Sequence, residues 1–250
     1  MNDLDSQVYK TVRRGYNNED TIFFLGEKLE KLYQTKEDVP YLLNRGYKIK
    51  QASLFVSNHY MLQERQRLVL ARAIAKDEDI ENRKRKISNK DHLAGSEVYI
   101  DGFNAIIPME TMLSASLLIR CMDGTLRDLA GLKGNYRIID KTEKAIRLIL
   151  CKLDNLEIRR ANIYLDKPVS NSGRLKALIL NVAEEYNVDI NVELLNAVDK
   201  ALYGKHNVIS GDSVVIDESI SWIPLYNMIL EDYEKSNKTW VIDFYNERAK

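Results

Sequence analysis

Three segments of this 250-residue chain end a strand-like run with an aspartate, and this repeat constrains the fold more than any other feature. The runs cover residues 98–100, 161–165 and 207–211. The aspartates that follow them are Asp101, Asp166 and Asp212. Open α/β folds bind ligands where the carboxyl ends of parallel strands meet. We therefore expect these three carboxylates to converge at one edge of a sheet.

Strand-like and helix-like segments alternate from residue 97 onward, which predicts an α/β region with a mostly parallel sheet flanked by helices. Before residue 94 the apolar residues recur at helical spacing instead. We therefore divide the chain into a small all-helical domain with a polar linker, residues 1–93, and an α/β domain, residues 94–250.

Local signals set the expected helix boundaries. Helices are expected over residues 20–34, 41–45, 49–58, 62–75, 108–119, 142–153 and 175–185. Asp38 and Pro40 indicate a helix start, because proline suits the first turn of a helix. Residues 76–92 are almost wholly polar and are predicted to be a linker or a frayed helix extension. Residues 214–216 are expected to continue the strand before Asp212 or to bend back on it.

The chain has 37 basic and 37 acidic residues, so its net charge does not indicate a nucleic-acid partner. Its apolar runs are far shorter than the roughly 20 residues that cross a bilayer. Residues 1–6 are acidic and lack an apolar stretch, unlike a signal peptide. We therefore expect a cytoplasmic protein without a membrane partner.

The distribution of charge is more informative than its sum. Residues 39–76 hold seven basic residues against one acid, which makes a local basic surface. The candidate substrate-binding arginines there are Arg45, Arg65 and Arg72. Short helices with a glycine-containing turn and exposed arginines are typical of helix-turn-helix domains. Charged helix faces are more often only solvated, so both interpretations stay open.

Carboxylates are the remaining candidates for chemistry, because the chain lacks the P-loop, dinucleotide-binding and HExxH motifs. Besides the strand-end aspartates, the candidate metal ligands are Asp199 and Glu110. Hard oxygen ligands suit Mg²⁺ or Mn²⁺ rather than zinc. Such ions activate water and stabilise a phosphodiester under attack, so the predicted chemistry is phosphodiester hydrolysis. The alternative is that each aspartate only caps a helix or a turn.

A polar loop after Asp166 leads into the helix expected near residue 175. Its candidate substrate-binding residues are Ser170, Asn171, Ser172, Arg174 and Lys176. Hydroxyl groups and main-chain N–H groups at a helix start, with basic side chains nearby, bind phosphate. An ordinary capping loop explains the same residues equally well.

Several longer segments carry a family resemblance. They cover residues 43–47, 95–104, 123–130, 165–176 and 210–213. They resemble an archaeal and bacterial family that joins a DUF434 region to a DUF5616 C-terminal domain, from about residue 38 onward. The C-terminal half is in turn similar to PIN and NYN nuclease domains.

The similarity to PIN domains implies roles for particular residues. Asp101 and Asp212 become the leading metal ligands, Asp166 and Asp199 fill the middle positions, and Asn104 orients substrate or water. The family pattern places another acid two residues after the late aspartate, where this chain has Val214, with Asp217 as a substitute. PIN-like domains are often dimeric, so a homodimer is a candidate assembly.

Three functions follow from these observations. The first is a ribonuclease dependent on Mg²⁺ or Mn²⁺, in which the basic helical region holds single-stranded or structured RNA. The second is a PIN-like RNA-binding protein that has lost turnover. The third is a metal-dependent phosphatase acting on a small phosphorylated metabolite, which needs no basic N-terminal region.

Overall fold

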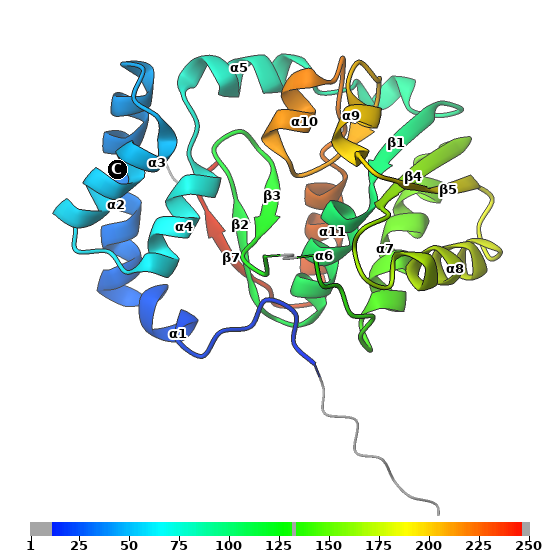
Figure 1. Ribbon diagram of the computed structural model, residues 1–250, viewed down its shortest axis with the longest axis horizontal. Helices are drawn as coiled ribbons and strands as arrows, with labels where there is room; N and C mark the ends of the chain where they lie inside the picture. Colours follow the sequence, from blue (N-terminus) through cyan, green and yellow to red (C-terminus); the bar gives the residue numbers. More distant parts are fainter. Residues whose placement is uncertain (1–11, 132–133, 247–250) are drawn as a thin grey trace, which may run out of the picture.

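The computed structural model describes residues 12–131 and 134–246, and it confirms the predicted arrangement of an N-terminal helical region followed by an α/β region (Figure 1). Residues 1–6, from which no signal peptide is predicted, lie outside the described residues. Within the described part of the chain, every helix is too short or too polar to span a membrane.

From residue 12 onward, the N-terminal region consists of five helices and a short 3₁₀ turn. They are α1 (Asp20–Phe23), α2 (Gly26–Asn44), α3 (Ile49–His59), α4 (Glu64–Ala73), α5 (Asp77–Arg85) and η1 (Lys90–His92). The predicted helix start at Pro40 is wrong, because α2 continues through it. Proline removes one helical hydrogen bond, but Val39 and Pro40 are buried, and this burial offsets the loss.

Helix α5 replaces most of the predicted linker. Its first turn holds three acids and its last turn three basic residues, an order that matches the helix dipole. On its inner side Ile80 and Arg83 are buried, and the main-chain oxygen of Arg83 accepts a hydrogen bond from Trp222 Nε1 at 2.8 Å. The helix is therefore anchored to the α/β region.

The larger sheet has four parallel strands in the order β5, β4, β1, β6. They are β1 (Glu97–Asp101), β4 (Arg160–Asp166), β5 (Asp189–Leu195) and β6 (Val208–Ile209). After β1 the chain adds β4 and β5 on one side and then returns to place β6 on the other side of β1. The strand order therefore reverses between β1 and β6, where open α/β folds bind their ligands.

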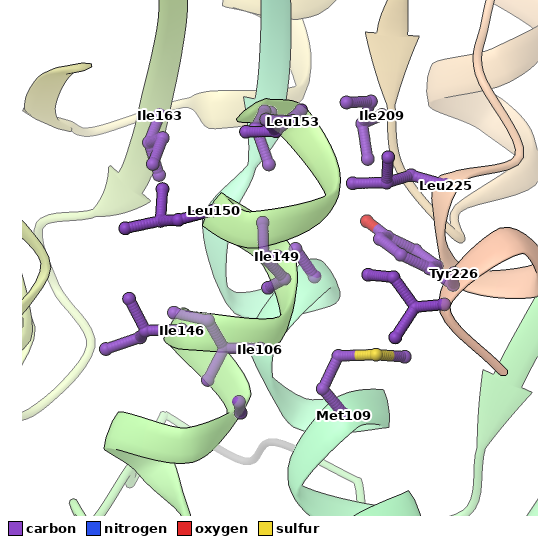
Figure 2. Close-up of a cluster of buried hydrophobic side chains, with 14 of the residues drawn as sticks. Ile106, Met109, Ile146, Ile149, Leu150, Leu153, Ile163, Ile209, Leu225 and Tyr226 are labelled. Atoms are coloured by element: carbon purple, nitrogen blue, oxygen red, sulfur yellow. The ribbon is translucent and has the colours of Figure 1, made fainter. Parts of the chain in front are cut away.

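Helices cover both faces of this sheet. They are α6 (Gly102–Leu113), α7 (Thr142–Asn155), α8 (Ser172–Ala183), α9 (Val198–Leu202), α10 (Ser213–Glu218) and α11 (Leu225–Glu234). Figure 2 shows α7 packed on one face, where Ile149 and Leu150 meet apolar side chains of α6, β4 and α11. On the other face, α9 and α10 cover Val208 and Tyr99.

Several expected boundaries in this region are wrong. Helix α6 begins at Gly102, directly after the strand, and passes through Pro108 instead of starting there. It ends at Leu113, and residues 117–119 of the expected helix belong to strand β2 (Leu117–Arg120). Residues 214–216 belong to α10, which begins after Asp212 because this carboxylate accepts a hydrogen bond from Val214 N at 2.7 Å.

A smaller sheet of three strands joins the two regions. Its order is β3 (Leu126–Asp128), β2 (Leu117–Arg120) and β7 (Trp240–Asp243). Alternate residues of β2 face opposite ways: Leu117 and Ile119 pack with α2, α3 and α4, whereas Leu118 belongs to the core of the α/β region. The helical region thus shares an apolar core with residues that follow position 94.

Candidate functional site

Four aspartates lie around the carboxyl edge of the four-stranded sheet, beside the point where the strand order reverses. Asp101 is the last residue of β1 and Asp166 the last of β4. Asp199 lies in α9, directly after β5, and Asp212 caps α10, directly after β6. The structure therefore brings the four strand-associated aspartates to one edge, as the sequence predicts.

Asp101 is the central member of this group and is buried, with 2% of its surface exposed. Its Oδ2 accepts hydrogen bonds from Asn104 Nδ2 at 2.6 Å and from Ser210 Oγ at 3.1 Å. Ser210 Oγ in turn accepts a hydrogen bond from Asp212 N at 3.0 Å. This chain of bonds ties the ends of β1 and β6 together and fixes the orientation of the Asp101 carboxylate.

The glycine after Asp101 has a packing role. A Cβ atom at Gly102 would lie 2.9 Å from the main-chain oxygen of Tyr164 and 2.6 Å from Leu165 Cδ2. Only glycine therefore lets the start of α6 approach β4 this closely. In the sequence Asp-Gly, the aspartate places a carboxylate at the strand end. The glycine has no side chain that would push the start of α6 away from β4.

The charges at this edge interact unfavourably. Burial raises the pKa of Asp101 to about 7, and the nearby charge of Asp199 adds to the rise. Burial also raises the pKa of Asp166, with a further contribution from Asp199, and the pKa of Asp199, with a contribution from Asp212. Among the described residues, Asp101 forms no ion pair with a lysine, arginine or histidine. No cationic side chain of residues 12–131 and 134–246 therefore compensates its negative charge.

The donor set is chemically suited to a hard divalent cation, since it consists of carboxylate oxygens without histidine or cysteine. The uncompensated charge of Asp101 also fits a bound cation. Nevertheless, in residues 12–131 and 134–246 no three acidic, histidine or cysteine side chains form a group that could hold a metal ion. The residue types fit Mg²⁺ or Mn²⁺, whereas their side chains do not close a coordination site.

A cleft of about 260 Å³ opens next to the acidic edge. Asn104 and Asp212 line it on the side of the sheet, and Arg72 of α4 and Arg127 of β3 line it on the side of the helical region. Figure 1 shows β3 between α4 and α10, which carry these walls. Asn104 is exposed in the wall of the cleft and also donates a hydrogen bond to Asp101, so it connects the cleft to the buried carboxylate.

Glu110 does not belong to this site, although the sequence suggests it as a metal ligand. It is fully buried in α6, about 13 Å along the helix from Asp101 by the rise per residue. Its Oε2 pairs with Arg14 Nε at 2.7 Å, and its Oε1 accepts hydrogen bonds from Tyr136 and Thr142. Both oxygens are used inside the protein, which is a structural role.

The polar loop before α8 holds a neighbouring segment. Ser170 Oγ accepts a hydrogen bond from Tyr136 N at 2.9 Å, and Asn171 Nδ2 donates to Tyr136 O at 2.7 Å. Ser172 is buried, and its hydroxyl donates to the main chain of Lys167 at 3.4 Å. These three side chains therefore have partners inside the protein. The two basic residues predicted for this loop lie in the first turns of α8, where Arg174 is exposed and Lys176 is partly buried.

The three arginines predicted for substrate binding lie in different surroundings. The Arg65 guanidinium binds both carboxylate oxygens of Asp20, with Nε donating to Oδ1 and Nη2 donating to Oδ2. The Arg45 guanidinium stacks on Tyr41, 3.5 Å from the ring centre. Arg72 lines the cleft, where its Nη1 donates to the main-chain oxygen of Asp128. Of these arginines, Arg72 is the one placed beside the acidic edge.

Asp217 is not a substitute for the acid missing at Val214. It pairs with Arg83 at 2.7 Å, and Arg83 also binds the buried Asp123 at 2.8 Å. Val214 itself is exposed on α10. The late strand therefore contributes one carboxylate, Asp212, to the edge.

Sequence reasoning missed two side chains at the site. Ser210 orients Asp101 and lies in the segment Ser-Gly-Asp-Ser, residues 210–213, which also contains the predicted ligand Asp212. Tyr226 comes from α11, and its hydroxyl is buried without a hydrogen-bond partner among the described residues (Figure 2). Burial raises the pKa of Tyr226 well above its usual value, and the charge of Asp101 adds to this. No local motif marks Tyr226.

Comparisons with known proteins place this chain in a family. Residues 90–228 match the family described as "Domain of unknown function (DUF5616)", and residues 31–86 match "Protein of unknown function (DUF434)". The chain belongs to the DUF5616 family and carries a DUF434 region before it, which confirms the predicted resemblance.

One relative spans most of the chain. An uncharacterised protein of Methanocaldococcus jannaschii is 36% identical over 191 residues, which is 76% of this chain and 91% of that protein. No solved structure matches the chain. The similarity to PIN and NYN nuclease domains stays a prediction.

Proposed function

We propose that the protein is a metal-dependent nuclease that hydrolyses phosphodiester bonds of RNA at the carboxyl edge of its parallel sheet. The observation that carries this proposal is the buried carboxylate of Asp101 at the strand-order reversal, which has no cationic partner among the described residues and shares its sheet edge with three further aspartates. Such a group is costly in a folded protein unless a cation binds it.

The residues have distinct roles in this proposal. Asp101, Asp166, Asp199 and Asp212 would hold Mg²⁺ or Mn²⁺. A bound ion of this kind supplies an activated water and neutralises charge on the phosphate. Asn104 and Ser210 keep the Asp101 carboxylate oriented through their hydrogen bonds. Arg72 and Arg127, across the cleft, offer positive charge to the phosphate of the substrate.

The test is cleavage of a mixed single-stranded RNA pool by the full chain with Mn²⁺ or Mg²⁺, compared with a chelator. We expect Asp101→Asn to lower the rate at least about 100-fold, as expected when a ligand of a catalytic ion is lost. The matched control is Asp189→Asn, an exposed aspartate at the opposite, amino edge of the same sheet. Equal cleavage by Asp101→Asn and wild type would overturn the proposal.

A second readout does not depend on activity. At pH 8, Mn²⁺ at about 100 times its dissociation constant should stabilise the wild type by about 2.7 kcal/mol and leave Asp101→Asn nearly unchanged. Thermal unfolding with and without the ion measures this difference. An equal response of both proteins would exclude Asp101 as a ligand.

A binding protein without turnover is the second candidate, favoured by the open arrangement of the carboxylates and by Val214 in place of a second late acid. It predicts that RNA is bound, remains intact with either metal, and is held equally well or better by Asp101→Asn. Turnover of p-nitrophenyl phosphate but not of bis(p-nitrophenyl) phosphate would instead support the metabolite phosphatase. Deleting residues 1–93 is unsuitable as a test, since it would expose one face of β2 and β7.

A further inference from the structure

A second cleft of about 310 Å³ continues from the first along the boundary between the helical region and the α/β region. Arg72, Arg127 and Ser213 line both clefts. The second cleft is further lined by Tyr47 and Lys76 from the helical region. The two clefts therefore form one continuous path that begins at Asp212 and ends beside α2.

The balance of charge along this path goes from neutral in the first cleft to positive in the second. The first cleft has two arginines against Asp128 and Asp212. The second has four basic side chains, Arg72, Lys76, Arg83 and Arg127, against Asp79 and Asp123. Among the described residues Arg72 forms no ion pair, and Arg127 Nε is buried without a hydrogen-bond partner. Arg83 and Arg127 pair with Asp123, whereas Lys76 pairs with the exposed Glu78 at 3.0 Å and with Asp79 at 3.4 Å. Solvent-exposed pairs contribute little, so Lys76 can exchange its partners for a phosphate.

Tyr47 has a fixed place in the wall of this second cleft. Helix α2 ends in a turn with Gly46 at φ +86°, where Gly46 N donates to Leu43 O at 2.9 Å and Tyr47 N donates to Leu42 O at 3.2 Å. This pair of bonds is the Schellman arrangement that closes a helix end. Tyr47 leaves it with 55% of its surface exposed, so its ring is available to a ligand.

We propose that this second cleft binds the nucleotides that flank the scissile phosphate of a single nucleic-acid strand, with Arg72 and Lys76 on the phosphates and Tyr47 stacked on a base. Basic grooves with aromatic side chains bind single strands in this way. Clefts of these volumes each hold one small ligand-sized group, so an unpaired strand fits and a duplex does not. The inference rests on the proposed function for the position of the scissile phosphate.

The test measures binding of fluorescein-labelled eight-nucleotide oligouridine, its thymidine counterpart and a duplex of equal length by fluorescence anisotropy. EDTA is present throughout, so cleavage and metal binding do not enter. Binding of either single strand, with weaker binding of the duplex, supports the proposal. Absence of binding, or preference for the duplex, overturns it.

Matched substitutions locate the contact. Tyr47→Ala should weaken single-strand binding about 10-fold, which corresponds to the loss of one stacked base. Tyr41→Ala, with the same exposed fraction but outside both clefts, should have no effect. Equal effects of the two variants on binding would overturn this proposal and would leave the proposed nuclease function untested, because the assay contains EDTA.

Salt dependence tests the phosphate contact. Lys76→Gln should reduce the slope of log affinity against log salt by about 0.7, the value for one phosphate contact on a single strand. The control is Lys50→Gln, an exposed lysine of α3 outside the cleft. An unchanged slope for Lys76→Gln also overturns the proposal, whereas metal-dependent cleavage tests the proposed function independently.

Discussion

Helix α6 connects two buried carboxylates whose surroundings differ. Glu110, inside the helix, has Arg14 as a cation and Tyr136 and Thr142 as donors. Asp101, which caps the same helix, has the neutral donors Asn104 and Ser210 and no cation among the described residues. Removing one partner of a compensated buried pair is costly, whereas a buried charge without a cation costs stability until a ligand binds. The comparison separates a structural acid from a candidate functional one.

The largest effect on stability is expected from Glu110→Gln. The substitution leaves Arg14 without its carboxylate, and breaking a buried pair in this way costs about 3–5 kcal/mol. Urea unfolding monitored by circular dichroism measures the change, with Asp101→Asn at the same pH as the comparison. A loss below about 1 kcal/mol would show that Glu110 is not the structural partner of the pair.

The pH dependence of stability should reveal Asp101. Its pKa rises from 3.8 in the unfolded chain to about 7 in the folded protein, so between these values the folded state holds a proton that the unfolded state has lost. The free energy of unfolding therefore falls as pH rises through this window, by on the order of 4 kcal/mol over its full width. Asp101→Asn should lack this decline and should be the more stable protein at pH 8. Parallel profiles of the two proteins from pH 5 to pH 8 would contradict the assignment.

A smaller effect is expected from Gly102→Ala, which tests how Asp101 is positioned. The added methyl group meets the main-chain oxygen of Tyr164, so β4 or α6 must shift, at a cost of about 1–3 kcal/mol. Gly173→Ala is the control, since that position, at the start of α8, has open space around it. If both variants unfold at the same urea concentration, close packing does not hold Asp101 in place.

Much of the fold could be predicted because its signals are local. The apolar spacing of residues 142–153 marks α7, and the aspartates after strand-like runs mark the ends of β1 and β4. The errors occur where burial outweighs a local signal: Pro40 and Pro108 are both buried at positions inside a helix. For α5 the acidic start and basic end were a usable signal that composition obscured.

The sequence by itself determined that carboxylates follow several strands, that glycine follows the first of them, and that the N-terminal region is helical and basic. These properties depend on residues close together along the chain. Only the tertiary structure decided which charges are compensated. Glu110 pairs with Arg14, 96 positions away, and Asp217 pairs with Arg83, 134 positions away. It also decided that Arg72 faces the acidic edge while Arg65 is bound to Asp20. Such pairings arise from packing between distant segments, for which a single sequence carries no periodic signal.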